Sequence, residues 1–225
     1  RESTVPGYDL VVMADFNLDG GAFVSTINYV NAAIALGLKV AIFHWRRADL
    51  DVTMPLKPSL RERARAGEFD ILTAGERVDA RRVLVGYPVV LKYRLDAVPT
   101  IRAEQFVILV NQMAARLTDG GDPQYDPRRI QTNVTELFGI EPLWVPISGL
   151  VHRLMRQDGR YPAPHTQVWS PLLDVENWCE STVTWRGAER KVPVLGRHAR
   201  DHYTKWPSSA EALAQAYCAD QACEV

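Results

Sequence analysis

The sequence has few of the residues that mark several common classes of protein. It contains only three cysteines, Cys179, Cys218 and Cys223, and no Cys-x-x-Cys pair or Cys/His spacing suited to zinc. This argues against a metal site and favours a reducing compartment. No apolar run reaches the ~18 residues that a membrane span needs. The formal net charge is only −1, so the chain as a whole has no electrostatic attraction to nucleic acid or to an anionic membrane.

Several catalytic signatures are also missing. The sequence has no Gly-x-Gly-x-x-Gly fingerprint, no Walker motif and no Gly-x-Ser-x-Gly elbow, which argues against a dinucleotide site and against a hydrolase triad. What is present is the composition of an ordinary globular protein, with 47% hydrophobic and 24% charged residues among 225. A chain of this length fits one large domain, or one domain and part of another.

A strand, a glycine-containing loop, a helix and a second strand follow one another near the N-terminus. Residues 8–16 form a short apolar run suited to a strand buried on both faces. Apolar side chains then recur on one helical face over residues 22–36, and Gly37 marks the end of that helix. The next strand is expected over residues 39–45. This order predicts a right-handed βαβ crossover and therefore a parallel sheet.

The alternation of strands and helices continues along the chain. The fold class is therefore α/β, with a doubly wound, mostly parallel Rossmann-like sheet. Further strands are expected over residues 69–73, 83–93, 104–112 and 142–147, and further helices over residues 58–66, over 127–138, and from a Ser148 cap through Arg156.

The distribution of these patterns predicts three parts. We expect an N-terminal Rossmann-like domain over residues 1–165 and an interdomain linker over residues 166–191, where proline and tryptophan replace regular periodicity. Residues 192–225 are expected to form the first strand and helix of a truncated second Rossmann-like domain.

Two adjacent glycines lie between the first expected strand and helix. Gly20 and Gly21 would let backbone N–H groups approach a ligand closely, and the helix N-terminus adds partial positive charge. Ser25, in the first turn of the expected helix, would add a hydroxyl donor. A tight turn without any ligand is the alternative.

Polar residues also follow two later strands. Asn111 and Gln112 end an apolar strand and are suited to bind sugar hydroxyls, or simply to cap the strand end. Ser148 is open to the same two interpretations, because helix capping alone would explain it. His44 ends the second expected strand, and a packed histidine is a better interpretation there than a catalyst.

The most informative stretch runs from Val192 to Pro207. An apolar strand leads through Gly196 into a cationic loop with Arg197, Arg200 and Lys205. A basic loop at the carboxyl end of a strand is where open α/β sheets bind phosphate-bearing ligands. Arginine offers a planar fork and lysine a mobile point charge, so this set is suited to a diphosphate. A solvated basic loop is the alternative.

The ordered set of motifs resembles the GT-B glycosyltransferases, especially the retaining, glycogen-synthase-like group. Each segment corresponds to a part of that family in the same order. Those segments are the glycine loop at 19–25, the strand and capped helix at 145–148 and 151–156, the interdomain stretch at 168–178, and the Gly-Arg…Lys stretch at 192–205.

The resemblance implies transfer of a sugar from a nucleotide-sugar donor to a carbohydrate, glycan or glycolipid acceptor, with retention and without metal or cofactor. Arg197 and Lys205 would be the catalytic residues, which stabilise the departing diphosphate electrostatically. Residues 192–225 would then open the donor-binding domain. The substrate-binding residues would be Gly20, Gly21, Ser25, Asn111, Gln112, Ser148 and Arg200.

The same resemblance sets expectations about location and completeness. We expect a cytoplasmic protein, with association at the inner face of the membrane left open and no nucleic-acid partner. The acidic motif with which the family binds the nucleotide ribose is not in the sequence before Val225, so the chain alone is expected to have little transferase activity. A non-catalytic carbohydrate- or nucleotide-binding α/β module is the alternative. An epimerase is a weaker one, because it needs a dinucleotide fingerprint and a Tyr-x-x-x-Lys pair that the sequence lacks.

Overall fold

The structure is a computed structural model, and it describes residues 7–46, 53–115, 123–173, 209 and 211–212 of the chain. The chain divides into two compact units, Arg1–Asp174 and Val175–Val225. Every helix and strand given below lies in the first unit. The strand expected at Val192, and the cationic loop with Arg197, Arg200 and Lys205, fall outside the described residues.

A six-stranded parallel sheet forms the framework of the first unit, in the order β3-β2-β1-β4-β5-β6. This is the strand order of doubly wound nucleotide-binding sheets, and it confirms the fold class expected from the sequence. The strands are β1 (Gly7–Ala14), β2 (Val40–His44), β3 (Asp70–Ile71), β4 (Arg77–Val85), β5 (Thr100–Val110) and β6 (Leu143–Pro146).

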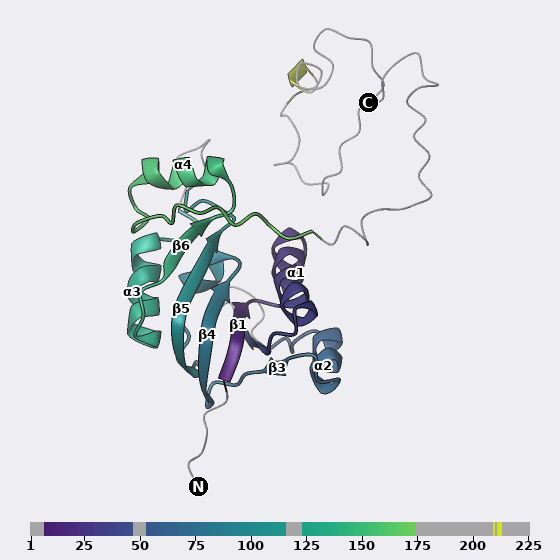
Figure 1. Cartoon of the computed structure of the whole chain (residues 1–225). Coiled ribbons are helices and arrows are strands. Elements are labelled where there is room, and N and C mark those ends of the chain that lie inside the picture. Colours follow the sequence, from purple (N-terminus) through teal and green to yellow (C-terminus); the bar gives the residue numbers. More distant parts are fainter. Residues whose placement is uncertain (1–6, 47–52, 116–122, 174–208, 210, 213–225) are drawn as a thin grey trace, which may run out of the picture. The chain divides into compact units, whose positions relative to one another are not determined.

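Helices lie on both faces of the sheet (Figure 1). The helices α1 (Gly21–Ala35) and α2 (Pro58–Arg65) cover one face, while α3 (Pro127–Phe138) and the 3-10 helix η1 (Pro88–Lys92) cover the other. The helix α4 (Gly149–Asp158) follows β6. Within the described part of the chain, no helix combines the length and the apolar character needed to cross a bilayer.

Side chains of β1 alternate between the two layers of the core. Val11 and Met13 belong to the cluster that includes Ile130 of α3, whereas Val12 and Ala14 pack with Val30 of α1. Because successive side chains of a strand point to opposite faces, a strand covered on both sides must be apolar throughout. This explains the unbroken apolar run that predicted β1.

The best-predicted helix is α3, because its ends are marked chemically. The side chain of Asp126 accepts hydrogen bonds from the backbone N–H groups of Arg128, at 3.0 Å, and Arg129. Pro127 occupies the first helical position, and Gly139 ends the helix with φ of 67°. These are the N-cap, N1 and C-terminal preferences of helices, and the predicted bounds 127–138 are confirmed.

One predicted strand is wrong. The expected strand over residues 83–93 is instead the last part of β4 followed by η1, whose buried residues 88–91 cover the sheet. The first half of β4 was not predicted as a strand. Its alternate residues Val78 and Ala80 are buried in the core, and its charged side chains have partners on β5. Asp79 binds Arg102 through two hydrogen bonds of 2.9 Å, and Arg82 donates to Gln105 at 2.9 Å.

The first residues of the expected linker pack on the first unit. The Trp169 N–H donates to the Pro146 carbonyl at 2.9 Å, and the Trp169 side chain packs against the α1 side of the core. Tyr29 donates to the Ser170 carbonyl at 3.1 Å and Asn28 to the Leu172 carbonyl at 2.8 Å. Residues 169–172 therefore form hydrogen bonds with both β6 and α1.

Candidate functional site

The carboxyl ends of the six parallel strands meet at one edge of the sheet, the upper edge in Figure 1. The chain winds from β1 to β3 in one direction and from β4 to β6 in the other, so the order reverses between β1 and β4. Ligands of open α/β sheets bind at such a switch point. The loops that follow β1, β5 and β6, which carry the predicted site residues, all begin at this edge.

The glycine pair lies at the switch point, at the start of α1. Gly20 holds the N-cap position with φ of 85°, a left-handed conformation that favours glycine, and it supplies no side-chain cap. A Cβ atom on either Gly20 or Gly21 would meet no described atom within 4 Å. Both residues are exposed. The N–H groups of the first turn are therefore accessible to a ligand, and the helix dipole favours an anion there.

A lysine that the sequence did not single out lies beside this loop. Lys57, which precedes α2, donates to the Asp19 carboxylate at 2.8 Å and to the Leu18 carbonyl at 3.1 Å. Its ammonium group also lies 4.0 Å from the centre of the Phe23 ring. The hydrogen bond from Lys57 lowers the pKa of Asp19, whose side chain is 92% exposed. The glycine loop therefore has one cation and one competing carboxylate.

A third glycine sets the distance between α1 and β4. Gly86 follows β4 and is buried, and a Cβ atom there would lie 2.7 Å from the Thr26 hydroxyl of α1. Thr26 is itself buried and donates to the Ala22 carbonyl at 2.8 Å. Only a glycine allows α1 to approach the end of β4 this closely. Gly86 therefore positions the N-terminal half of α1 over the switch point.

The two predicted amides after β5 have different environments. The Gln112 side-chain oxygen accepts a hydrogen bond from the Tyr87 hydroxyl at 3.1 Å, which ties the loop after β4 to the loop after β5. The Asn111 side-chain oxygen is buried and has no hydrogen-bond partner among the described residues. Buried polar atoms are nearly always paired, so this oxygen is an exception among the described residues.

Asn17 lies between β1 and α1, just before the two glycines, and its side-chain oxygen has a similar environment. Its amide nitrogen donates to the carbonyls of Met54, at 3.3 Å, and Pro55, at 3.2 Å, so these contacts fix the orientation of the amide. Its oxygen is buried and unpaired within the described residues. Asn17 did not stand out in the sequence, because asparagine in a turn is common.

Two buried tyrosines hold the loop that contains the predicted amides. The Tyr125 hydroxyl donates to the Gln112 carbonyl at 2.6 Å, and the Tyr161 hydroxyl accepts from the Ala114 N–H at 2.7 Å. The two hydroxyls lie 2.9 Å apart, and their rings pack edge to face. Burial raises the pKa of both hydroxyls. Both therefore stay protonated and support the backbone after β5.

The predicted serines are less prominent. The Ser148 hydroxyl oxygen accepts from the Val151 N–H at 3.2 Å, so capping of α4 is confirmed. Ser25 is the fifth residue of α1, because the helix begins one residue earlier than expected. It therefore lies just past the first turn, which corrects the placement predicted for it.

A buried aspartate and a histidine lie together at the ends of β1 and β2. The Asp15 side chain is 4% exposed and that of His44 is 10% exposed, with 3.9 Å between Asp15 Oδ1 and His44 Nδ1. His44 Nδ1 accepts a hydrogen bond from the Phe16 N–H at 3.2 Å, and Asp15 Oδ1 accepts from the Asn17 N–H at 3.0 Å. Both acceptors therefore hold the backbone of the glycine loop, and His44 Nδ1 has no free lone pair for a general base.

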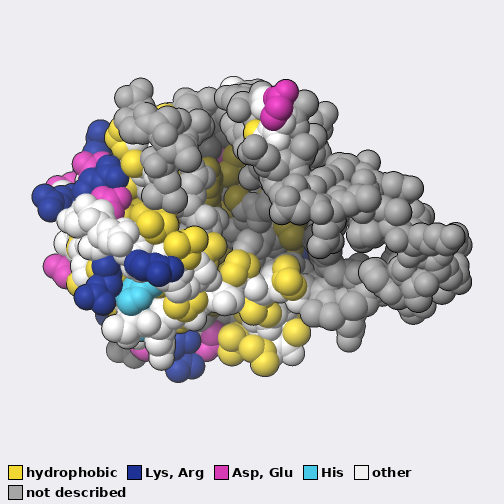
Figure 2. All heavy atoms as spheres, turned by 90° about the horizontal axis from the view of Figure 1, so that it is seen from above, with side chains coloured by type: hydrophobic (Ala, Val, Ile, Leu, Met, Phe, Trp, Pro, Cys, Tyr) yellow, Lys and Arg dark blue, Asp and Glu magenta, His cyan; other side chains and the backbone are white. Residues whose placement is uncertain are grey.

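Figure 2 looks down on the carboxyl edge. Lys and Arg side chains gather around a histidine at the left of the view, next to a broader area of apolar side chains. α4 lies on this side in Figure 1, and its exposed side chains include Arg153, Arg156 and Leu150. The described part of this edge therefore carries positive charge on the α4 side.

No group of three or more His, Cys, Asp or Glu residues is placed to hold a metal ion among residues 7–46, 53–115 and 123–173. Comparisons with protein-family models, with curated proteins and with solved structures found no match to this chain. A functional proposal for this chain therefore rests on its sequence motifs and on the geometry of the carboxyl edge.

Proposed function

We propose that this chain is a glycosyltransferase, or the N-terminal part of one, that moves a sugar from a nucleotide-sugar donor to a carbohydrate or glycan acceptor, with retention and without a metal ion. The proposal joins the resemblance of four ordered segments with the geometry of the carboxyl edge. In it the first unit supplies one side of the site, and the residues from Val192 onward begin the domain that binds the donor. We place this protein in the cytoplasm or at the inner face of the membrane.

The observation that carries the proposal is the open glycine pair at the switch point. Gly20 and Gly21 leave the first turn of α1 uncovered, and Lys57 adds a positive charge next to it. Backbone N–H groups, a helix dipole and a lysine together form a suitable environment for phosphate or for the charge that develops on it. The neutral amides of Asn111 and Gln112, which follow β5 at the same edge, are proposed to bind sugar hydroxyls.

The catalytic step would then be electrostatic. As the bond between the sugar and the diphosphate breaks, negative charge grows on the departing phosphate oxygens. Arg197 and Lys205 are proposed to stabilise this charge, with Arg200 contributing to donor binding. The leaving diphosphate would need no proton from a side chain. This is consistent with the hydrogen bonding of His44, which leaves no free lone pair for acid–base work.

The decisive experiment is a donor screen by calorimetry with UDP-, GDP- and ADP-sugars, run on the 225-residue chain and on the full-length gene product. We expect one donor to bind the full-length protein and to be turned over with a suitable glycan acceptor. Retention of the anomeric configuration is read from the product by NMR. Binding of no donor, or a product of inverted configuration, would contradict the proposal.

One observation favours a second function, a non-catalytic carbohydrate- or nucleotide-binding module. Beside its charged groups, the carboxyl edge carries neutral donors and acceptors, such as Asn111, Gln112 and Ser148. Such a set binds hydroxyl groups without needing to perform chemistry. Saturable sugar binding by the full-length protein, with no turnover of any nucleotide sugar, would identify this function.

A further inference from the structure

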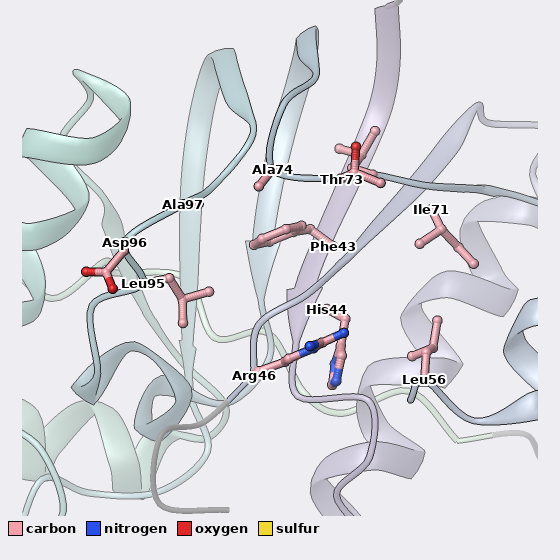
Figure 3. A pocket seen from close by; sticks show the side chains of 11 residues that line it. Phe43, His44, Arg46, Leu56, Ile71, Thr73, Ala74, Leu95, Asp96 and Ala97 are labelled. Atoms are coloured by element: carbon pink, nitrogen blue, oxygen red, sulfur yellow. The ribbon is translucent and has the colours of Figure 1, made fainter. Parts of the chain in front are cut away.

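A cavity of about 460 Å³ lies over the carboxyl ends of β2 and β3. It exists because the connection from β3 to β4, residues 72–76, contains no helix, although most crossovers in such sheets do. The residues lining the cavity come from four places: the end of β2, the end of β3 with the start of this connection, Leu56 before α2, and the loop at residues 95–97 (Figure 3). Its volume is within the range of small-molecule sites, roughly 300–1,000 Å³.

The walls of the cavity are mostly apolar and well supported. Phe43 forms the centre of the wall in Figure 3, with Leu95 on the opposite side. The Phe43 ring packs edge to face on Trp45, with 6.2 Å between ring centres, and both side chains are buried. Leu72 is also buried. A rigid apolar wall of this kind favours the flat or aliphatic body of a ligand.

The polar end of the cavity is formed by His44 and Arg46, which lie next to one another in Figure 3. Because His44 Nδ1 accepts the Phe16 N–H, the neutral ring carries its proton on Nε2. Arg46 contributes only donors. Burial is the main cause that lowers the pKa of His44, and the positive charge of Arg46 lowers it further. The carboxylate of Asp96, which also lines the cavity, is directed away from Phe43 in Figure 3.

We propose that this cavity binds a small organic anion, a carboxylate or a phosphate monoester, with an apolar body. The charged end would accept hydrogen bonds from Arg46 and from His44 Nε2–H, and the body would pack on Phe43, Leu72 and Leu95. The cavity shares no lining residue with the predicted glycine-loop and amide positions. This inference therefore does not rest on the proposed transferase function.

The test is a titration of the 225-residue chain followed by ¹H–¹⁵N NMR, with benzoate, phenyl phosphate, inorganic phosphate and benzyl alcohol as probes. We expect benzoate or phenyl phosphate to shift the amide signals of Phe43, His44 and Leu72 in a saturable way. Benzyl alcohol has the same body without charge, and should bind about 10-fold more weakly. Equal binding of benzyl alcohol would overturn the anion assignment. Inorganic phosphate that binds as tightly as phenyl phosphate would overturn the role of the apolar wall. Shifts confined to the glycine loop, or no shifts with any probe, would overturn the site.

Substitutions of Arg46 and His44 test whether these two residues bind the charged group of the ligand. Arg46→Met should weaken binding of the anionic probe about 10-fold, because a charge-assisted hydrogen bond is lost. His44→Asn keeps an acceptor near the position of Nδ1 for the Phe16 N–H but loses the Nε2 donor, so it should weaken binding without unfolding the chain. Arg156→Met on α4 is the matched control and should leave binding unchanged. Unaltered affinity in a folded Arg46→Met variant would overturn the proposal whatever the stability of His44→Asn.

Discussion

His44 Nδ1 lies 3.9 Å from the Asp15 carboxylate, yet its hydrogen bond comes from the Phe16 backbone N–H at 3.2 Å. Protonation of Nδ1 would place two N–H groups against each other and break this bond. Burial is the main reason why the pKa of His44 lies below its ordinary value, and Arg46 lowers it further, while Asp15 and the Ala14 backbone partly oppose the shift. Neutral His44 and Asp15 therefore hold the backbone of Phe16 and Asn17, which lead into the glycine loop.

The depressed pKa of His44 predicts how stability depends on pH. The unfolded histidine binds a proton near pH 6.5, whereas the folded one binds it only at lower pH, so the unfolded state holds more protons between these values. The free energy of unfolding should therefore be fully present above about pH 6.5 and should fall as the pH drops towards the folded pKa. Urea titrations between about pH 5 and pH 8 measure this. In His44→Asn the histidine contribution should disappear, and an identical pH profile in both proteins would contradict the argument.

Gly86 offers a steric prediction. Its backbone is outside the positive-φ region, so alanine there is disfavoured only by the 2.7 Å contact with the Thr26 hydroxyl. Gly86→Ala should lower the free energy of unfolding by about 1–3 kcal/mol, the usual cost of overpacking. In a Thr26→Ala background the same change should cost much less, because the nearest side-chain atom is gone. An equal loss in both backgrounds, measured by urea denaturation, would mean that the contact with Thr26 is not the cause.

The glycine loop can be tested through its charges. Asp19→Asn should tighten binding of UDP, because it removes a carboxylate and releases Lys57 from its ion pair. Lys57→Met should weaken the same binding, and each change is expected to be only a few-fold, since the groups are close to solvent. Calorimetry on the full-length protein provides the comparison, with Arg156→Met as a control. If instead UDP binds more tightly to Lys57→Met and more weakly to Asp19→Asn, the phosphate does not bind at this loop.

The cationic stretch outside the described residues carries the catalytic part of the proposal. Arg197→Ala and Lys205→Ala, made separately in the full-length protein, should each slow turnover of the nucleotide sugar by roughly 10²-fold or more, as expected for loss of a preorganised charge contact. The readout is kcat together with KM. A change in KM alone would point to donor binding without a role in the leaving step, and full activity in both variants would end the assignment.

Helices and strands were predicted well where the sequence has residues that mark their ends. α3 was predicted residue for residue because Pro127 and Gly139 mark its ends. The first half of β4 was missed, although its buried Val78 and Ala80 alternate with charged residues as in a half-buried strand. The pairing of those charges with Arg102 and Gln105 on β5 is a tertiary feature that leaves no local pattern.

Some residues of the candidate site could be predicted from the sequence, and others are recognised only in the structure. Gly20, Gly21, Asn111 and Gln112 could be found because they follow predicted strands, and strand ends meet at one edge. Lys57 reaches that edge from a different loop, and Gly86 acts through its contact with α1. Both depend on how the helices pack on the sheet, which periodicity alone does not specify. The hydrogen bond that fixes the His44 tautomer is equally a product of tertiary structure.

The buried tyrosine pair provides the last prediction. Tyr125 uses its proton for the Gln112 carbonyl, so Tyr161 must donate to Tyr125 while accepting from the Ala114 N–H. Tyr161→Phe should cost about 1–3 kcal/mol, because the buried Ala114 N–H loses its partner. Tyr29→Phe, which removes the bond to the Ser170 carbonyl, is the matched control and should cost less, because that bond is exposed to solvent. Faster hydrogen exchange at Ala114 in Tyr161→Phe alone would locate the effect in the loop after β5. A Tyr125→Phe change that adds its full cost in the Tyr161→Phe background would show that the two hydroxyls are not coupled.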